Sequence, residues 1–271
     1  MRKEMELLII GIVFMSALLI PMRVNKFGEG VEMEVGKTRI TTLFDNYAYD
    51  PNLETGWGFS CLIELENETI LFDTGANPEI LLRNMEKLGK DPKAIDKIIL
   101  SHIHGDHTGG LDGVLERNPN VTVYLLESFP EDFKLHVKAY GSEIVEISGP
   151  MRISRSVVTT GELGTWIKEQ SLLVRTKEGI IVITGCAHPG IVDIVRKAKD
   201  LTDEEIYLVL GGFHLGEANE LELERIVNEF RKLGVRKVSP THCSGDRAKQ
   251  IFEEEYKDDF VGNGVGKVIE G

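Results

Sequence analysis

The sequence predicts one α/β domain made of two related halves, and two observations carry this prediction. Short apolar runs of strand length alternate with segments of helical period, which is typical of helices packed on mixed sheets. The chain also repeats itself, because ENETILFDTGANPEI at 66–80 aligns with TKEGIIVITGCAHPG at 176–190. The shift is 110 positions (176 − 66), and the same shift places His104 on His214. Each half is therefore expected to be a ββαβ unit.

Apolar runs indicate the strands, and amphipathic patterns indicate the helices between them. Strands are expected at 38–44, 59–65, 69–73, 96–102, 120–126, 143–147, 171–176, 179–185, 206–212 and 235–240, and helices at 78–88, 190–198, 220–233 and 247–256. No Pro- or Ser-rich linker divides the chain after residue 33, so residues 34–271 are expected to form one domain. Loops after the matched strands of the two halves should open toward one region.

The N-terminal segment differs in character from the rest of the chain. Residues 7–20, LLIIGIVFMSALLI, form an uninterrupted apolar run with basic residues on both sides. As a helix this run would span about 21 Å, less than the ~30 Å of a bilayer core. That length fits a signal peptide, yet no small-residue cleavage site follows. Residues 1–33 are therefore expected to be a membrane anchor or signal segment and linker; the alternative is a cytoplasmic protein translated from Met22 or Met33.

Charge and cysteine content narrow the range of partners. A net charge of −13 argues against a nucleic-acid binder, because neutralising phosphates needs a basic face. The three cysteines are far apart and odd in number, so they do not indicate a disulfide framework. A small-molecule substrate is therefore expected, with any membrane contact made through the N-terminal segment.

The stretch SHIHGDHTGG places His102, His104, Asp106 and His107 within six positions. The first two histidines follow an apolar strand at alternate positions, so their imidazoles can point the same way. Gly105 is expected to permit a sharp turn that brings the other two side chains round. Imidazoles and a carboxylate suit zinc, iron or manganese. Because four such groups would crowd one tetrahedral ion, we expect two adjacent divalent ions, zinc before manganese or iron.

This stretch resembles the H-x-H-x-D-H motif of the metallo-β-lactamase superfamily, and LFDTG at 71–75 resembles that superfamily's other early landmark. The resemblance covers nearly all of residues 36–270. It implies an αββα sandwich with a dinuclear metal site at one edge of the sheets. LFDNYAY, TGCAHPGIV, LGGFHL and PTHCSG together look like one branch, which contains a methanopterin-pathway synthase and metal-dependent hydrolases.

The resemblance also implies a ligand set for each metal. The first metal would be held by His102, His104 and His188. The second would be held by Asp106, His107 and His242. The chain departs from the lactamase and glyoxalase pattern, because no GHT-type histidine occurs between residues 106 and 184.

A second departure lies at Cys186, where those enzymes carry the aspartate of a TGD turn, so an acidic bridge between the metals is not implied. The thiol could bind a soft metal ion or pack beneath the loop, and we favour packing. Asp73 is expected to hydrogen-bond a ligand imidazole or nearby backbone. Asn46 is expected to line the pocket, or else to cap a turn. His214 is expected to contact substrate, with metal ligation and simple burial as alternatives.

The chemistry follows from the expected ions. A metal-bound water can have its pKa lowered from ~15.7 to about 7, which supplies hydroxide at neutral pH. We therefore expect a hydrolase that acts on a phosphoester or similar activated bond of a small molecule, with Asp106 and His214 as catalytic residues. The alternative, implied by the resemblance, is a transferase that joins a pterin-methyl diphosphate to an aryl ribosyl phosphate. A non-catalytic metal-holding module is the least favoured interpretation.

Overall fold

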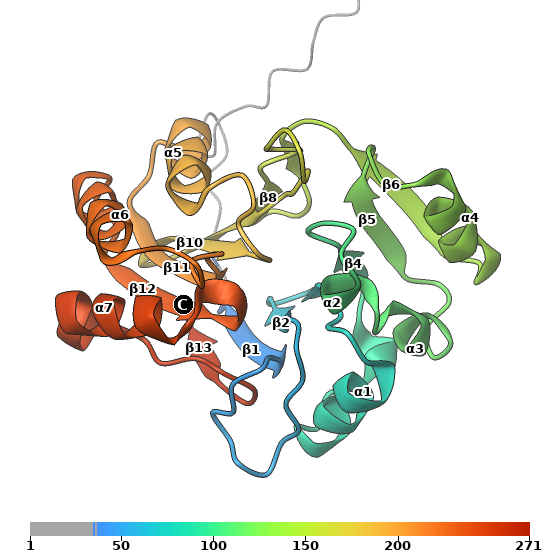
Figure 1. Ribbon diagram of the computed structural model, residues 1–271. Coiled ribbons are helices and arrows are strands. Elements are labelled where there is room, and N and C mark those ends of the chain that lie inside the picture. The colour runs from blue at the N-terminus through green and yellow to red at the C-terminus, as the bar shows by residue number, and fades with distance from the viewer. Residues whose placement is uncertain (1–34, 36) are drawn as a thin grey trace, which may run out of the picture.

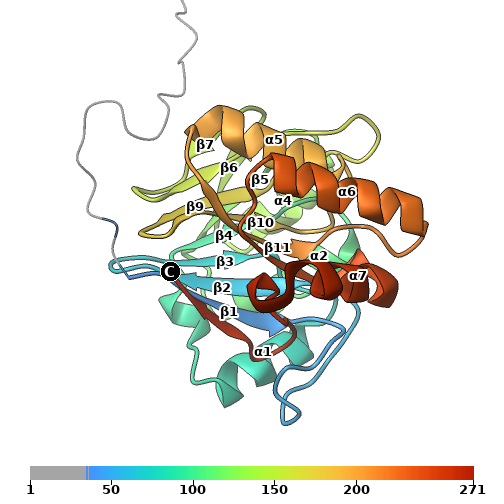
Figure 2. The same cartoon turned by 90° about the vertical axis from the view of Figure 1, so that its left-hand side faces the viewer.

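Two sheets lie face to face with helices on their outer sides in the computed structural model, which describes residue 35 and residues 37–271 (Figures 1 and 2). The seven-stranded sheet has the order β13-β1-β2-β3-β4-β5-β6, and the six-stranded sheet has the order β12-β11-β10-β9-β8-β7. The expected αββα sandwich is confirmed. The N-terminal segment, residues 1–33, lies outside the described residues, and within the described part of the chain no helix is long and apolar enough to span a bilayer.

The first sheet and its helices come from the first half of the domain. They are β1 (Arg39–Phe44), β2 (Ser60–Glu64), β3 (Thr69–Phe72), α1 (Pro78–Lys87), β4 (Lys97–Ile99), α2 (Gly105–Thr108), α3 (Leu111–Leu115), β5 (Thr122–Leu126), α4 (Glu131–Ala139) and β6 (Glu143–Ile147).

The second sheet and its helices come from the second half. They are β7 (Met151–Arg152), β8 (Val157–Thr159), β9 (Leu172–Thr176), β10 (Gly179–Thr184), α5 (Ile191–Thr202), β11 (Ile206–Gly212), α6 (Glu220–Lys232), β12 (Lys237–Thr241) and α7 (Asp246–Tyr256). The last strand, β13 (Val268–Glu270), returns to the first sheet and pairs antiparallel with β1.

The internal repeat corresponds to two equivalent ββαβ units. In the first unit β2 and β3 form an antiparallel pair, α1 follows, and β4 returns parallel to β3. In the second, β9 and β10 are antiparallel, α5 follows, and β11 returns parallel to β10. Even the register matches, because Leu71 pairs with Ile98 and Ile181 pairs with Leu208, each 110 positions further along (181 − 71 and 208 − 98).

Three apolar layers hold the sandwich together, because the central strands are buried on both faces. In β3, Ile70 and Phe72 pack between the two sheets, whereas Leu71 packs against the helices of the first half. In β10, Ile181 points to the same inter-sheet layer and Val182 to the helices of the second half. This alternation explains why the strands read as continuous apolar runs.

Helix caps explain where the amphipathic segments begin. The Asn77 side chain accepts a hydrogen bond from the Ile80 amide at the start of α1. Asn219 does the same for the Glu222 amide at the start of α6. Helix α5 extends four residues beyond its expected end at Ala198, because its periodic apolar face continues to Thr202. Gly105 begins α2 without a positive φ, so Asp106 and His107 lie on this short helix.

The aromatic core beneath α6 gives a stability prediction. Phe230 is fully buried, and its ring centroid lies 5.6 Å from that of Phe252 and 5.9 Å from that of Phe213. Phe230→Ala should lower the free energy of unfolding by about 3–5 kcal/mol, through lost burial and the cavity left behind. Leu221→Ala on the same helix should change it by less than ~0.5 kcal/mol, because Leu221 is 77% exposed. Urea unfolding measures both, and equal losses would contradict this packing.

Candidate metal centre

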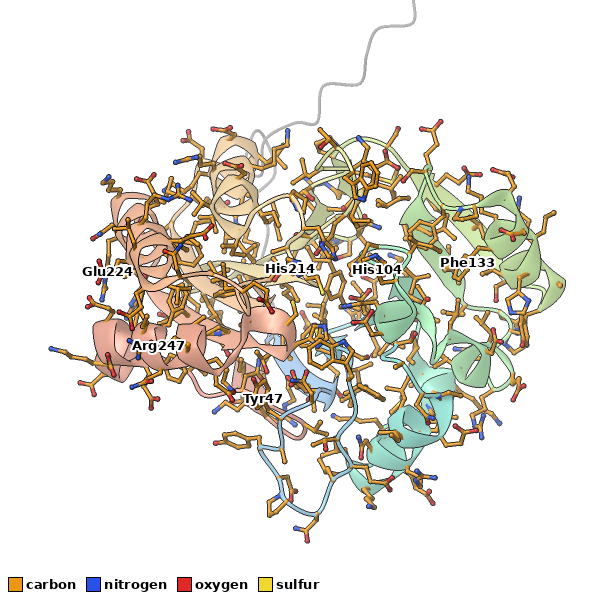
Figure 3. The ribbon with its side chains drawn as sticks, viewed as in Figure 1. Tyr47, His104, Phe133, His214, Glu224 and Arg247 are labelled. Atoms are coloured by element: carbon orange, nitrogen blue, oxygen red, sulfur yellow. The ribbon has the colours of Figure 1, made fainter. Side chains whose placement is uncertain are left out.

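The candidate site is formed by loops that leave strand ends at one edge of the sandwich (Figure 1). Four of these loops hold a non-glycine residue with positive φ: Asp73 after β3, Ala187 after β10, His214 after β11 and His242 after β12. Such conformations cost on the order of 1–3 kcal/mol each and persist where the surrounding structure fixes them, which is common at functional sites. The histidines at 104 and 214 approach this region from opposite halves (Figure 3).

One group of imidazoles combines His102 and His104, from the first motif (SHIHGDHTGG, residues 101–110), with His188 from the loop after β10. The ring centroid of His102 lies 4.7 Å from that of His104 and 4.9 Å from that of His188. His104 and His188 are also 4.9 Å apart. The structure thus brings together the three residues expected at the first metal, and His102 and His188 form a potential donor group with the Cys186 thiol.

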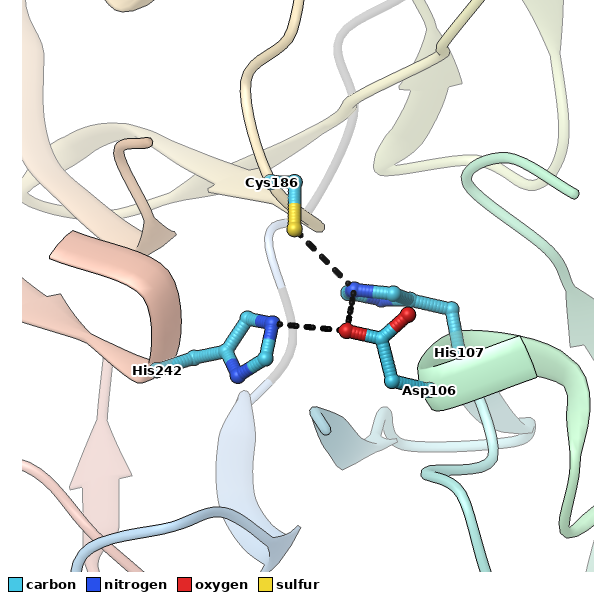
Figure 4. A group of neighbouring side chains, drawn as sticks. All are labelled: Asp106, His107, Cys186 and His242. Atoms are coloured by element: carbon cyan, nitrogen blue, oxygen red, sulfur yellow. Dashed lines mark hydrogen bonds and ion pairs between the residues drawn. The ribbon is translucent and has the colours of Figure 1, made fainter. Parts of the chain in front are cut away.

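A second group lies beside the first and contains Asp106, His107, Cys186 and His242 (Figure 4). Their donor atoms all lie within 4.8 Å of one another. The Asp106 carboxylate is 3.3 Å from His242 Nε2 and 3.6 Å from His107 Nε2. The Cys186 Sγ atom is 3.2 Å from His107 Nε2 and belongs to both donor groups. The thiol therefore faces the centre of the cluster, although we favoured packing beneath the loop from the sequence.

The buried Asp73 carboxylate holds the first motif in place. Its Oδ1 accepts the Ser101 amide at 2.7 Å, and its Oδ2 accepts the Ser101 hydroxyl at 2.7 Å. The same Oδ2 lies 2.7 Å from His107 Nδ1, which leaves His107 Nε2 directed at the donor group. Burial lowers the pKa of His107, but the charge and hydrogen bond of Asp73 outweigh it and raise the pKa overall.

Asn46 holds His242 in a similar way. Its Oδ1 lies 3.0 Å from His242 Nδ1, and its side-chain amide donates to the His242 carbonyl at 3.3 Å. The neighbouring Asp45 carboxylate accepts the Thr241 hydroxyl at 2.7 Å, which ties the end of β1 to the end of β12. Both loops are therefore fixed before any ligand arrives, and the second ring nitrogen of His242 faces Asp106 in the donor group.

Glu169, which no sequence motif indicates, is a buried carboxylate that supports the loop after β10. Its oxygens accept the backbone amides of Cys186, Ala187 and His188 at 2.8–2.9 Å. Burial raises the pKa of Glu169, and the three amide hydrogen bonds act in the opposite direction. Glu169 lies outside every motif, so only the three-dimensional structure relates it to the candidate ligands.

Two properties of the imidazoles favour binding of a cation: unsatisfied ring nitrogens and lowered pKa values. His188 Nε2 is buried and has no hydrogen-bond partner, which is costly unless another ligand satisfies it. His242 Nε2 is also buried, and it makes an ion-pair contact with Asp106 at 3.3 Å without the geometry of a hydrogen bond. Burial and the His214 imidazole lower the pKa of His188 to about 4. Burial and the adjacent imidazoles also hold the pKa of His102 far below its ordinary value. Neutral imidazole is the form that binds metal ions.

His214 lies at the exposed end of the cluster. Its ring centroid is 4.3 Å from that of His188, and its donor atom groups with the thiols of Cys186 and Cys243. A hydrogen bond with Cys243 is the main cause of its raised pKa. The sequence did not single out Cys243 as a site residue, although it directly follows His242. His214 is thus close to the candidate ligands and open to solvent.

Comparisons with known proteins agree with this arrangement. The profile of the metallo-beta-lactamase superfamily matches residues 58–242. The 7,8-dihydropterin-6-methyl-4-(beta-D-ribofuranosyl)-aminobenzene-5'-phosphate synthase of Methanocaldococcus jannaschii is 33% identical, over 88% of this chain and 99% of its own length. An uncharacterized protein of the same organism is 33% identical, over 85% of this chain and 99% of its own length.

A solved structure extends the likeness to three dimensions. Tm1679, described as a metal-dependent hydrolase of the beta-lactamase superfamily, is 30% identical with a TM-score of 0.73, over 86% of this chain and 99% of its own. YhfI from Bacillus subtilis, a metallo-beta-lactamase fold protein, shares the fold with a TM-score of 0.64 at 15% identity, over 87% of this chain and all of its own (100%). With its four-layer sandwich and its clustered donor groups, this chain belongs to the metallo-beta-lactamase superfamily.

Proposed function

We propose that this protein is a metal-dependent condensing enzyme, which joins a pterin-methyl diphosphate to an arylamine that carries a ribosyl phosphate. The observation that carries this proposal is the likeness to the Methanocaldococcus synthase, because it extends over 88% of this chain and 99% of that enzyme. The donor groups around Asp106 support a metal-dependent reaction. The transferase that we held as the alternative thus has better support than the hydrolase that we preferred from the sequence.

Two divalent ions, zinc before manganese or iron, would be held by this cluster of side chains. The first ion would take His102, His104 and His188, and the second would take Asp106, His107 and His242. When bound, such ions stabilise negative charge on a diphosphate group as it leaves and also lower the pKa of bound water. The shared position of Cys186 suggests that its thiol binds one or both ions.

The remaining residues would orient these ligands and manage protons. Asp73 and Asn46 fix the rings of His107 and His242 through their Nδ1 atoms. Glu169 fixes the backbone from which His188 projects. His214, with its raised pKa and open position, would hold a proton beside the leaving group and contact its negative charge.

Hydrolysis remains the second candidate, because Tm1679 is described as a hydrolase and shares 30% identity over 86% of this chain. In both reactions an oxygen-linked leaving group would depart beside the candidate ligands. They differ in the attacking group, which is an arylamine nitrogen in the condensation and water in the hydrolysis.

A two-substrate assay separates these reactions. Metal-loaded protein receives a pterin-methyl diphosphate with and without the arylamine ribosyl phosphate, and products are identified by mass spectrometry. Condensed product with one diphosphate released per coupling is expected. Release of diphosphate at the same rate without arylamine, and no coupled product, would support the hydrolase and contradict our proposal.

Removing one ligand should remove one ion. His242→Ala should reduce the bound metal from about two ions per chain to about one, because the second donor group then keeps only part of its set. His136→Ala is the matched control, since His136 is exposed and pairs with Asp112 on the outer surface. Elemental analysis of both purified variants measures the change. Unaltered metal content in His242→Ala would exclude this histidine as a ligand.

His214 should affect turnover without affecting metal content. His214→Gln should lower kcat by about 100-fold, the lower end of what a positioned acid contributes, while elemental analysis still finds the wild-type metal content. A loss of metal would instead identify His214 as a ligand. Wild-type kcat in this variant would show that the imidazole does not contact the reacting groups.

A further inference from the structure

Trp57 is a large apolar side chain that stays exposed beside the candidate metal centre. Its side chain is 60% exposed, and its ring centroid lies 5.1 Å from that of His242 with the planes 55° apart. Tryptophan is normally buried to a greater extent, because its ring removes about 150–250 Å² of surface from water when covered. The exposed indole therefore borders the candidate metal centre on the side of His242.

The backbone on both sides of Trp57 is tightly anchored. The Gly56 amide donates to the Asp45 carbonyl at 3.0 Å, and the Phe59 amide donates to the Asp106 carbonyl at 3.2 Å. Gly58 has φ +144 and lies so close to Asp106 that a Cβ would sit 2.3 Å from its carbonyl oxygen. The loop that carries the indole is thus fixed to the same turn that presents Asp106.

The preceding part of the loop is held by helix α1. Arg83 binds the Glu54 carboxylate through two nitrogen atoms, at 2.8 and 2.6 Å. The buried Asn84 side chain donates to the Glu54 carbonyl at 2.8 Å and accepts the Glu54 amide at 2.9 Å. These contacts fix the backbone of the loop on both sides of Trp57.

Other exposed aromatic side chains in the described part of the chain have different surroundings. Tyr49, 54% exposed, lies on the same loop with Lys267 over its ring, 4.5 Å from the centroid. Trp166, 93% exposed, makes no ring contact with any of the candidate ligands. Among the exposed aromatic side chains of the described residues, only Trp57 combines an anchored backbone, an exposed ring and contact with a candidate ligand.

We propose that Trp57 is a stacking platform for a flat heterocyclic ring of the substrate, whose reactive substituent then reaches the metal centre. This inference rests on the proposed function, because it concerns how the same site takes its substrate. An indole face stacks on any flat ring system and contributes binding without specific hydrogen bonds. Binding of the ring should therefore depend on the indole and not on the metal ions.

The probe is 6-methylpterin, a flat ring without a diphosphate, titrated calorimetrically into the metal-free full-length protein. Trp57→Ala should weaken its binding by about 10- to 100-fold, as expected for loss of one stacking partner. Trp57→Phe should restore most of the affinity, because it keeps an aromatic face. Trp166→Phe is the matched control and should bind like wild type. In metal-loaded protein, inorganic diphosphate should bind equally to wild type and Trp57→Ala.

Two results would overturn the stacking role: equal affinity of wild type and Trp57→Ala for 6-methylpterin, or no binding of 6-methylpterin to wild type. Circular dichroism and urea unfolding of Trp57→Ala test whether this variant is folded, so that weaker binding by the folded variant can be assigned to the lost indole. Because the titration requires no turnover, it separates the two ideas. If pterin binding depends on Trp57 but no condensed product forms, the stacking role of Trp57 is supported and the condensing activity is contradicted.

Discussion

The buried carboxylate of Asp73 is the contact on which the arrangement of the site depends. Asp73 follows β3 and has a positive φ. Its carboxylate accepts hydrogen bonds from the backbone amide and the hydroxyl of Ser101, which lies just after β4. It also binds His107 on the following turn. One side chain thus joins two parallel strands to the first motif and sets which ring nitrogen of His107 faces the centre. The second half uses Glu169 for the same purpose, with three amides of the loop after β10.

Much of the fold follows from the sequence, because the central strands are buried on both faces and their apolar runs have strand length. The repeat between the halves even indicates the shared register of β3–β4 and β10–β11. The short strands β7, β8 and β13 and the helix α4 escape detection, since pairing partners and packing outside their own segments determine them.

The candidate site likewise contains some residues that the sequence indicates and others that only the structure shows. Residues inside motifs, such as His102 and Asp106, are visible from spacing, and the repeat leads to the loop that carries His214. Asp73 and Asn46, which support ligand imidazoles, are also indicated by the motifs around them, whereas other supporting or bordering residues are visible only in three dimensions. Glu169 acts through backbone amides, and Trp57 acts through a loop whose anchors are distant in sequence. The central position of the Cys186 thiol also depends on how its loop is held, which a single sequence does not reveal.

The central claim is that loops from both halves of the domain meet to bind a pair of ions. Anomalous X-ray diffraction from zinc-loaded crystals, measured at the zinc absorption edge, tests it most directly. Two anomalous peaks about 3.5–4 Å apart are expected. One peak should lie beside His102 and His188, and the other beside Asp106 and His242. A single peak, or peaks remote from these side chains, would contradict it.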